Sequence, residues 1–314
     1  MPALIETVLG PLSATDFGFA LPHEHVLCDF IGADKTGRHR WGASQVVATM
    51  RPYLEQARER GVASFVDCTP AYIGRDVRVL RRLSELTHLA LVTNTGYYGA
   101  AGDKFLPPHA FSESVDQLAD RWTRERERGI DGTNVRPGFV KIGVDPIPAG
   151  GPDQLSDVDA KLVRAAARVS KRTGLTVACH TVQGRAALAL LALLADEKAD
   201  PGRLIYVHAD GEPDTTYHRR VAEAGAWVEF DGIGGRPAAE HVALIAPLLP
   251  KHADRLLLSM DRGWYNAGEP NGGTVRPFTP LTDELLPALR RAGVAEAIIR
   301  KITVENPARA FAVP

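Results

Sequence analysis

Short apolar runs alternate with longer helical patterns along the whole chain of 314 residues, and this alternation constrains the fold more than any other feature. The apolar runs are rich in β-branched residues, as buried parallel strands are. Eight strand–helix units follow one another without a break in composition, which favours a closed barrel over an open doubly wound sheet. No glycine-rich phosphate fingerprint follows the first strand, which also argues against a dinucleotide-binding fold. We therefore predict an α/β protein with a TIM (β/α)8 barrel that forms one domain over residues 1–314.

Cap and turn signals set the bounds of the predicted elements. Ser44, Ser112 and Ser156 are plausible helix N-caps, and several helices are followed by glycine. The first eighteen residues are expected to form a hairpin that covers the bottom of the barrel. A Gly/Pro-rich loop at Arg262–Pro280 is expected to be a mobile lid that contributes to specificity. The predicted strands are Phe19–Asp29, Ala63–Thr69, His88–Thr95, Gly138–Val144, Leu175–His180, Arg203–His208, Ala226–Asp231 and Arg255–Asp261. The predicted helices are Ser44–Arg60, Asp76–Leu86, Ser112–Arg128, Ser156–Arg172, Arg185–Glu197, Asp214–Ala224, Ala238–His252, Asp283–Arg291 and Ala295–Lys301.

Composition limits the kinds of binding partner and the cellular compartment that are expected for this protein. A formal net charge of −1 provides no field that would attract nucleic acid or anionic lipid, so neither partner is expected. The longest apolar run, Ala186–Ala195, is far shorter than the ~20 residues that span a bilayer. The first residues lack the basic and apolar segments of a signal peptide. Three cysteines in strand-like segments are typical of reduced thiols, so we expect a cytoplasmic protein.

In a barrel of this kind the chemistry lies at the carboxyl ends of the strands, so polar residues there are the candidates. The first predicted strand carries His23 and His25, two residues apart, which places both imidazoles on one face. We expect both to point into the barrel mouth and Glu24 to point outward. A pair of histidines also occurs in polar clusters that bind no metal, so this motif does not decide the function by itself.

Lys141 lies in the middle of the fourth predicted strand, where a charged amine is costly unless it is paired or modified. One reading is a salt-bridged lysine or one whose amine reaches solvent. The other is a neutral amine that reacts with carbon dioxide to give a carbamate. Because a carbamate has two anionic oxygens, it can bridge two cations.

Three more strands end in a residue that can bind a metal. These residues are His180, His208 and Asp261, on the fifth, sixth and eighth predicted strands. Each residue alone is a weak signal, because single polar residues are common at strand ends. The combined set of six side chains on one rim favours a metal centre with His23, His25, Lys141, His180, His208 and Asp261 as ligands.

This ordered set resembles that of the amidohydrolase superfamily and, more narrowly, the phosphotriesterase-like family, which includes bacterial phosphotriesterases and lactonases. The motifs that carry the resemblance are PHEHVLCD around His23, FVKIG around Lys141 and the ENPAR segment at Glu305–Arg309. The resemblance covers nearly the whole chain. The chain departs from many relatives at Val207, where they have glycine, and this departure affects no ligand.

The resemblance implies two divalent cations, with zinc the first candidate and manganese, cobalt or iron the others. His23, His25 and Asp261 would hold the more buried cation, and His180 and His208 the more exposed one. Carboxylated Lys141 and a hydroxide would bridge the two. Asp261 would accept the proton of the attacking hydroxide as the catalytic acid–base. The resemblance also implies a homodimer.

Five residues near the rim are predicted to contact the substrate. Tyr97 and Tyr98 follow the third strand, and Tyr98 resembles the aromatic residue of the leaving-group pocket in relatives. Arg236 and Arg262 are candidates for binding a carboxylate or a phosphate, although a surface salt bridge is the simpler reading for both. Trp264 begins the long final loop.

The function that these observations favour is hydrolysis of a small-molecule lactone or carboxylic ester, with promiscuous hydrolysis of organophosphates. Alternatives that use the same site are a phosphotriesterase as the main activity and a hydrolase of small N-acyl amides. An alternative from another class is a ligand-binding barrel that has lost catalysis. The complete ligand set argues against that last reading.

Overall fold

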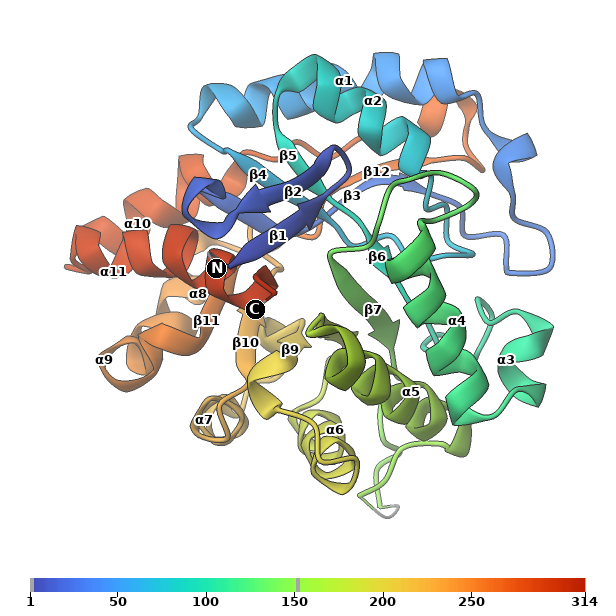
Figure 1. Cartoon of the computed structure of the whole chain (residues 1–314). Helices are drawn as coiled ribbons and strands as arrows, with labels where there is room; N and C mark the ends of the chain where they lie inside the picture. The colour runs from blue at the N-terminus through green and yellow to red at the C-terminus, as the bar shows by residue number, and fades with distance from the viewer. Residues whose placement is uncertain (1–2, 151–152, 314) are drawn as a thin grey trace.

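The computed structural model describes residues 3–150 and 153–313. Nine short strand segments form the barrel, and helices surround them in Figure 1. The barrel segments are β3 (Ala20–Cys28), β4 (Ser64–Asp67), β5 (Ala90–Val92), β6 (Asn94–Thr95), β7 (Phe139–Gly143), β8 (Thr176–His180), β9 (Leu204–Val207), β10 (Trp227–Phe230) and β11 (Leu256–Leu258). Outside the barrel proper lie β1 (Leu4–Thr7), β2 (Gly10–Ser13) and β12 (Gly263–Asn266).

The helices cover the outer face of the strands. The larger helices are α1 (Ala43–Glu59), α2 (Val77–Thr87), α4 (Val115–Arg128), α5 (Asp157–Thr173), α6 (Gly184–Asp196), α7 (Thr215–Glu223) and α8 (Ala238–Ile245). The shorter ones are α3 (Pro108–Ser112), α9 (Leu249–His252), α10 (Leu286–Arg291), α11 (Glu296–Arg300) and α12 (Asn306–Phe311). Among the described residues no helix is both long and apolar enough to cross a bilayer.

All the barrel strands pair in parallel, in two sheets whose orders are β11-β10-β9-β8-β7-β6 and β12-β3-β4-β5. The sheets share one chain segment, because β5 and β6 are separated only by Thr93. On the opposite side the segment after β11 bonds to β3: the Asp261 amide donates to the His23 carbonyl at 3.1 Å, and the Ser259 hydroxyl accepts from the His23 amide at 2.9 Å. The chain is thus an α/β barrel, as predicted.

Alternation along the strands gives the barrel interior two layers. On β7, Phe139 belongs to the apolar inner cluster, and Lys141 lies two residues nearer the carboxyl end. On β10, Trp227 belongs to the same cluster, and Glu229 follows it with the same spacing. Alternate residues face the same side of a strand, so each of these two strands carries an apolar residue low in the barrel and a polar one above it. The polar layer is the floor of the site.

The lower end of the barrel is closed by both ends of the chain. β1 and β2 pair antiparallel, and Leu4 forms a further antiparallel bridge with Val313. Ile5 and Phe17 pack into the same apolar cluster as Phe311 of α12. The hairpin predicted for the first residues is therefore present, and it lies across the strands in Figure 1.

Several predicted bounds are corrected by the structure. α1 begins at Ala43 with no side-chain cap, so Ser44 does not cap it, whereas the Ser156 hydroxyl caps α5 as expected. The helix predicted at Ser112–Arg128 begins later, as α4 at Val115, because Ser112 is the last residue of α3, and Ser114 caps α4 in a capping box with Gln117. The predicted helix at Ala238–His252 is divided into α8 and α9 with a 3₁₀ turn between them.

The loop expected at Arg262–Pro280 contains regular structure. Its first part is β12, which pairs in parallel with β3, and Gly263 also forms an antiparallel bridge with Arg276. Only the remainder, with a 3₁₀ turn at Pro270–Gly272, is irregular. This segment was predicted to be a loop because its many glycines and prolines are not typical of a strand.

Candidate metal centre and active site

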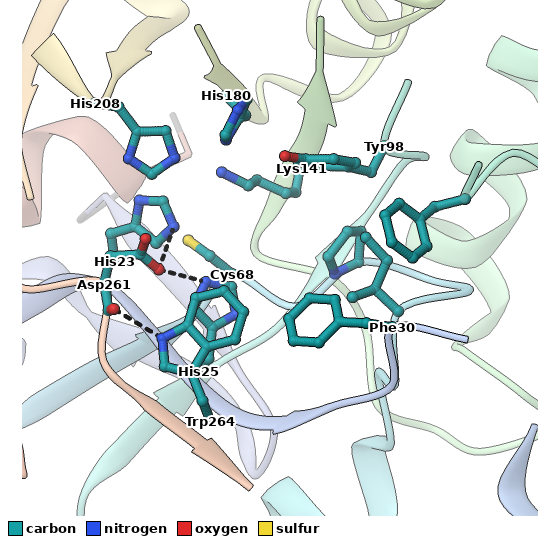
Figure 2. Close-up of a pocket in the computed structure, with 13 residues that line it drawn as sticks. His23, His25, Phe30, Cys68, Tyr98, Lys141, His180, His208, Asp261 and Trp264 are labelled. Carbon is teal, nitrogen blue, oxygen red and sulfur yellow. Dashed lines mark hydrogen bonds and ion pairs between the residues drawn. The ribbon is translucent and has the colours of Figure 1, made fainter. Parts of the chain in front are cut away.

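All six predicted ligands line one cavity of about 100 Å³ at the carboxyl end of the barrel. Figure 2 shows His23, Lys141, His180, His208 and Asp261 directed toward a common space. The other lining residues come from β12 (Trp264) and from loops above the strands, and most of them are apolar or aromatic: Phe30, Cys68, Pro70, Ile73, Tyr98, Phe105 and Trp264.

Local backbone geometry explains why these side chains meet. His23 and His25 are alternate residues of β3, so both imidazoles lie on the inner face. His208 and Asp261 lie just beyond β9 and β11 and have left-handed backbone conformations, with φ of 63° and 49°. Residues other than glycine rarely adopt this region, and such conformations cluster at functional sites. The left-handed bend aims each side chain across the barrel mouth.

His23, His25 and Asp261 form a compact group that is suited to a cation. Their ligand atoms all lie within 4.8 Å of one another. The Asp261 Oδ1 is 3.0 Å from His25 Nε2 and 3.8 Å from His23 Nε2. The sequence prediction assigned these three residues to one cation, and the structure brings them together.

His180, His208 and Lys141 complete the rim. The His180 and His208 ring centroids are 4.4 Å apart, and the His23 and His208 rings are 5.1 Å apart. Lys141 is 2% exposed, and its Nζ has no hydrogen-bond partner among the described residues. A buried amine without a partner is costly, so it calls for a modification or a ligand.

Asp231, which was not among the residues predicted from the sequence, orients two of the predicted ligands. Its Oδ2 is 2.8 Å from His23 Nδ1, and its Oδ1 is 2.8 Å from His208 Nδ1. With both Nδ1 atoms engaged by this carboxylate, the Nε2 lone pairs of the two imidazoles are left for a cation. A signal was available, because Asp231 ends the seventh predicted strand and strand ends were the search criterion.

His25 is oriented by a neutral partner. Its Nδ1 is 2.8 Å from the Thr69 hydroxyl, and its Nε2 faces Asp261. Burial lowers the pKa of His25 to about 4, and burial together with the charges of His208 and Lys141 holds the pKa of His180 well below its usual range. Both imidazoles are therefore neutral near pH 7, the form that binds metals.

The charge on Asp261 is favoured by its neighbours. Burial acts to raise the pKa of Asp261, but the contact with His25 and the charges of His23 and His25 hold it well below its usual range. Asp261 is therefore ionised near neutral pH. An anionic carboxylate, the neutral imidazoles of His25 and His180 and a buried amine belong to a donor set that fits divalent transition metals.

Of the five predicted substrate contacts, Tyr98 and Trp264 line the cavity. The Tyr98 ring lies 5.0 Å from the His180 ring. The Trp264 ring lies 4.2 Å from the His25 ring, and its Nε1 donates to the Asp261 carbonyl at 2.8 Å. These two residues therefore contact both the space for the substrate and the predicted ligands.

The other three predicted contacts are not brought to the cavity. Tyr97 is buried against Trp122, and its hydroxyl pairs with His109 Nε2 at 3.0 Å. The Arg262 guanidinium donates to the carbonyls of residues 233 and 234, and Arg236 donates to the carbonyl of residue 210. Both arginines thus bind backbone carbonyls.

Two acidic residues outside the predicted ligand set hold the backbone around the site. Glu24, expected to point outward from the barrel mouth, is fully buried and accepts from the Ser259 hydroxyl at 2.7 Å and from the Arg262 amide at 2.8 Å. The carboxylate of Asp210 accepts from the amides of Asp231 and the following glycine, so it stabilises the loop that holds Asp231.

Comparison with known proteins agrees with this architecture. The family model described as "Phosphotriesterase family" matches residues 3–311. The aryldialkylphosphatase of Saccharolobus solfataricus is 27% identical over 312 residues, which cover 96% of each chain. The phospho-furanose lactonase of Mycoplasmopsis synoviae is 28% identical over 331 residues, which cover 98% of this chain and 91% of that protein.

A solved structure is similar over the same extent. A mutant of organophosphorus hydrolase from Deinococcus radiodurans superposes with a TM-score of 0.86 at 31% sequence identity, covering 99% of this chain and 97% of that one. The family match and this structural similarity both extend over nearly the entire barrel. The chain therefore belongs to the phosphotriesterase family and is a hydrolase.

Proposed function

We propose that this protein is a binuclear-metal-dependent hydrolase of lactones or related carboxylic esters, with organophosphate hydrolysis as a side activity. The observation that carries the proposal is the shared cavity, in which the His23, His25 and Asp261 group faces His180, His208 and the unpartnered Lys141. His23, His25 and Asp261 would hold one cation and His180 and His208 the other, with Lys141 as a carbamate between them.

Two such cations, when bound, lower the pKa of a shared water and polarise the carbonyl or phosphoryl oxygen of the substrate. The protein's own part is orientation and proton transfer. Asp261 is ionised and lies at the centre of the ligand group, so its carboxylate can take the proton released during attack and pass it to the leaving oxygen. Cys68 also lines the cavity, but burial raises the pKa of its thiol, which argues against a thiolate nucleophile.

The walls of the cavity favour a neutral substrate. Apart from the predicted ligands, its described lining offers apolar and aromatic side chains, the Tyr98 hydroxyl and the Cys68 thiol. The arginines at positions 236 and 262 are engaged with backbone carbonyls elsewhere. Burying a phosphate or sulfonate against such walls without a partner is costly. This supports an uncharged lactone over a phosphorylated sugar lactone.

The test combines metal analysis with a substrate panel. Purified protein should contain or bind about two zinc, manganese or cobalt ions per chain and should hydrolyse uncharged lactones faster than paraoxon, aryl esters or N-acyl amides. Asp261→Asn should lower kcat by about 10²- to 10⁴-fold, because a positioned acid–base contributes that much. As a matched control, Asp283→Asn alters a surface aspartate paired with Arg60 and should leave kcat unchanged.

The outcomes separate the alternatives. A metal-free protein with no affinity for these ions would exclude the proposal. A metal-loaded protein that hydrolyses none of the substrates would favour a binding role. Faster turnover of paraoxon or of an N-acyl amide than of any lactone would assign the main activity to the corresponding alternative.

A further inference from the structure

Glu229 is a buried carboxylate beneath the site, and it has no role in the proposed reaction. It lies on β10, two residues before Asp231, which directly follows the strand, and both side chains face inward. Its Oε2 is 3.3 Å from His23 Nδ1, the same nitrogen that Asp231 contacts at 2.8 Å. The side chain is 1% exposed, and its Oε1 has no hydrogen-bond partner among the described residues.

The imidazoles of the site therefore differ in the side chains that contact them on the side away from the cavity. The Nδ1 of His23 faces two carboxylates, that of His208 faces one, and that of His25 faces the Thr69 hydroxyl. For His180, the described residues provide ring contacts with Tyr98 and His208 but no side-chain hydrogen bond. Anionic acceptors behind a histidine fix its tautomer and increase its basicity as a ligand, so His23 should bind a cation most strongly.

A second buried carboxylate at one imidazole needs compensation. An unpaired charge in a protein interior is costly, and the single Nδ1 hydrogen of His23 cannot satisfy both Glu229 and Asp231. A cation on the Nε2 side of His23 would supply the missing positive charge through the imidazole. The position of Glu229 is thus understandable as part of a metal site.

We propose that Glu229 is a positioning residue that strengthens His23 as a ligand and makes the cation of the His23, His25 and Asp261 group the more slowly released of the two. Asp231 differs from it, because its two oxygens contact a ligand of each cation. This inference rests on the proposed two-cation site, and it concerns the retention of the cations.

The test follows metal release. Cobalt- or zinc-loaded protein is mixed with excess chelator, and release is recorded with a metal indicator. Wild type should release two cations in a fast and a slow phase. Glu229→Gln keeps the size and an acceptor oxygen but removes the charge, so the slow phase should accelerate about 10-fold while the fast phase is unchanged. Asp231→Asn should accelerate both phases.

Asp159 offers a matched control. It is a buried carboxylate on α5, 2% exposed, with one partnerless oxygen; its other oxygen accepts from the Asp145 amide, and among the described residues it forms no hydrogen bond or ion pair with a predicted ligand. Asp159→Asn should change neither release rate, even if it changes the melting temperature. Glu229→Met, which lacks any acceptor, should act in the same direction as Glu229→Gln and serves if the glutamine variant does not fold.

The possible outcomes are distinct. Unchanged release from folded Glu229→Gln, equal acceleration of both phases, or the same effect in Asp159→Asn would overturn the role of Glu229 while leaving the two-cation site intact. A wild-type protein that binds no cation would overturn the proposed function, and this inference with it. Selective acceleration of the slow phase in Glu229→Gln would support the role proposed for Glu229.

Discussion

At the residue scale, an ion pair between a buried arginine and a partly buried glutamate shows how the barrel wall tolerates charge. Arg75, with its side chain 3% exposed, donates to both oxygens of Glu125 at 2.9 and 2.7 Å and to the Asn94 carbonyl at 2.7 Å. Burial acts to raise the pKa of Glu125, but the charge and hydrogen bonds of Arg75 outweigh it and lower the pKa. Removing one partner of such a pair leaves the other uncompensated.

We therefore expect Glu125→Gln to lower the free energy of unfolding by about 3 kcal/mol at pH 7. Because the folded-state pKa of Glu125 is depressed, its stabilising contribution is present above the ordinary glutamate pKa of 4.5 and is lost as the pH falls through the folded-state pKa. The difference between wild type and variant in urea unfolding should thus shrink below about pH 4.5. A difference that stays constant with pH would contradict this account.

A surface acid provides the comparison for this prediction. Glu85 pairs with Arg81 and Arg82 on α2, but its side chain is 40% exposed. Solvent-exposed pairs contribute little, so Glu85→Gln should change the free energy of unfolding by less than about 0.5 kcal/mol.

The six predicted ligands could be located from the sequence because each lies at a strand end or on the inner face of a strand, where spacing fixes direction. The aromatic residues of the cavity walls could not be located in this way. Phe30 and Phe105 reach the cavity from loops, and loop conformation depends on contacts between distant segments, such as the 6.2 Å approach of these two rings. Glu229 was also missed, although it is a charged residue in the middle of a predicted strand, the same signal that identified Lys141.

At the element scale, the start of α4 shows the limit of cap signals. Two serines lie two residues apart, and the wrong one was chosen from the sequence. Ser114 accepts from the Gln117 amide at 3.2 Å, and the Gln117 side chain accepts from the Ser114 amide at 2.8 Å. Ser112 instead ends α3. The reciprocal pair with glutamine three residues later was the better signal.

This correction leads to a stability prediction. Ser114→Ala should lower the free energy of unfolding by about 1 kcal/mol, because it removes a side-chain N-cap. Ser112→Ala is the matched control and should have an effect smaller than about 0.5 kcal/mol. Urea denaturation of the two variants measures the difference, and a larger loss for Ser112→Ala would restore the original assignment.

At the scale of the whole molecule, barrel closure could be predicted from the number and order of strand–helix units, but the division of the strands could not. The third strand is interrupted at Thr93, and closure on the other side depends on hydrogen bonds from Ser259 and Asp261 to β3. Those two residues lie beyond the apolar run of β11. Hydrophobic periodicity therefore predicts the barrel strands, whereas the hydrogen bonds of irregular polar segments determine how the two sheets join into a closed barrel.

Cations should stabilise the whole fold, because their ligands come from strands all around the barrel. A cation at about 1,000 times its dissociation constant stabilises a folded protein by about 4 kcal/mol. For a chain of this size we expect a rise in melting temperature of roughly 10 °C on adding zinc or manganese to chelator-treated protein. The rise should be much smaller with magnesium, which prefers oxygen ligands. An equal rise with all three ions would argue against a site rich in imidazole.

The bridge between Leu4 and Val313 brings the two ends of the described chain together at the pole opposite the cavity. Fusion partners, affinity tags or a tether to a solid support joined at either end would therefore leave the mouth of the barrel facing solution. The same proximity makes the protein suited to circular permutation, in which the ends are linked and the chain is opened in a surface loop.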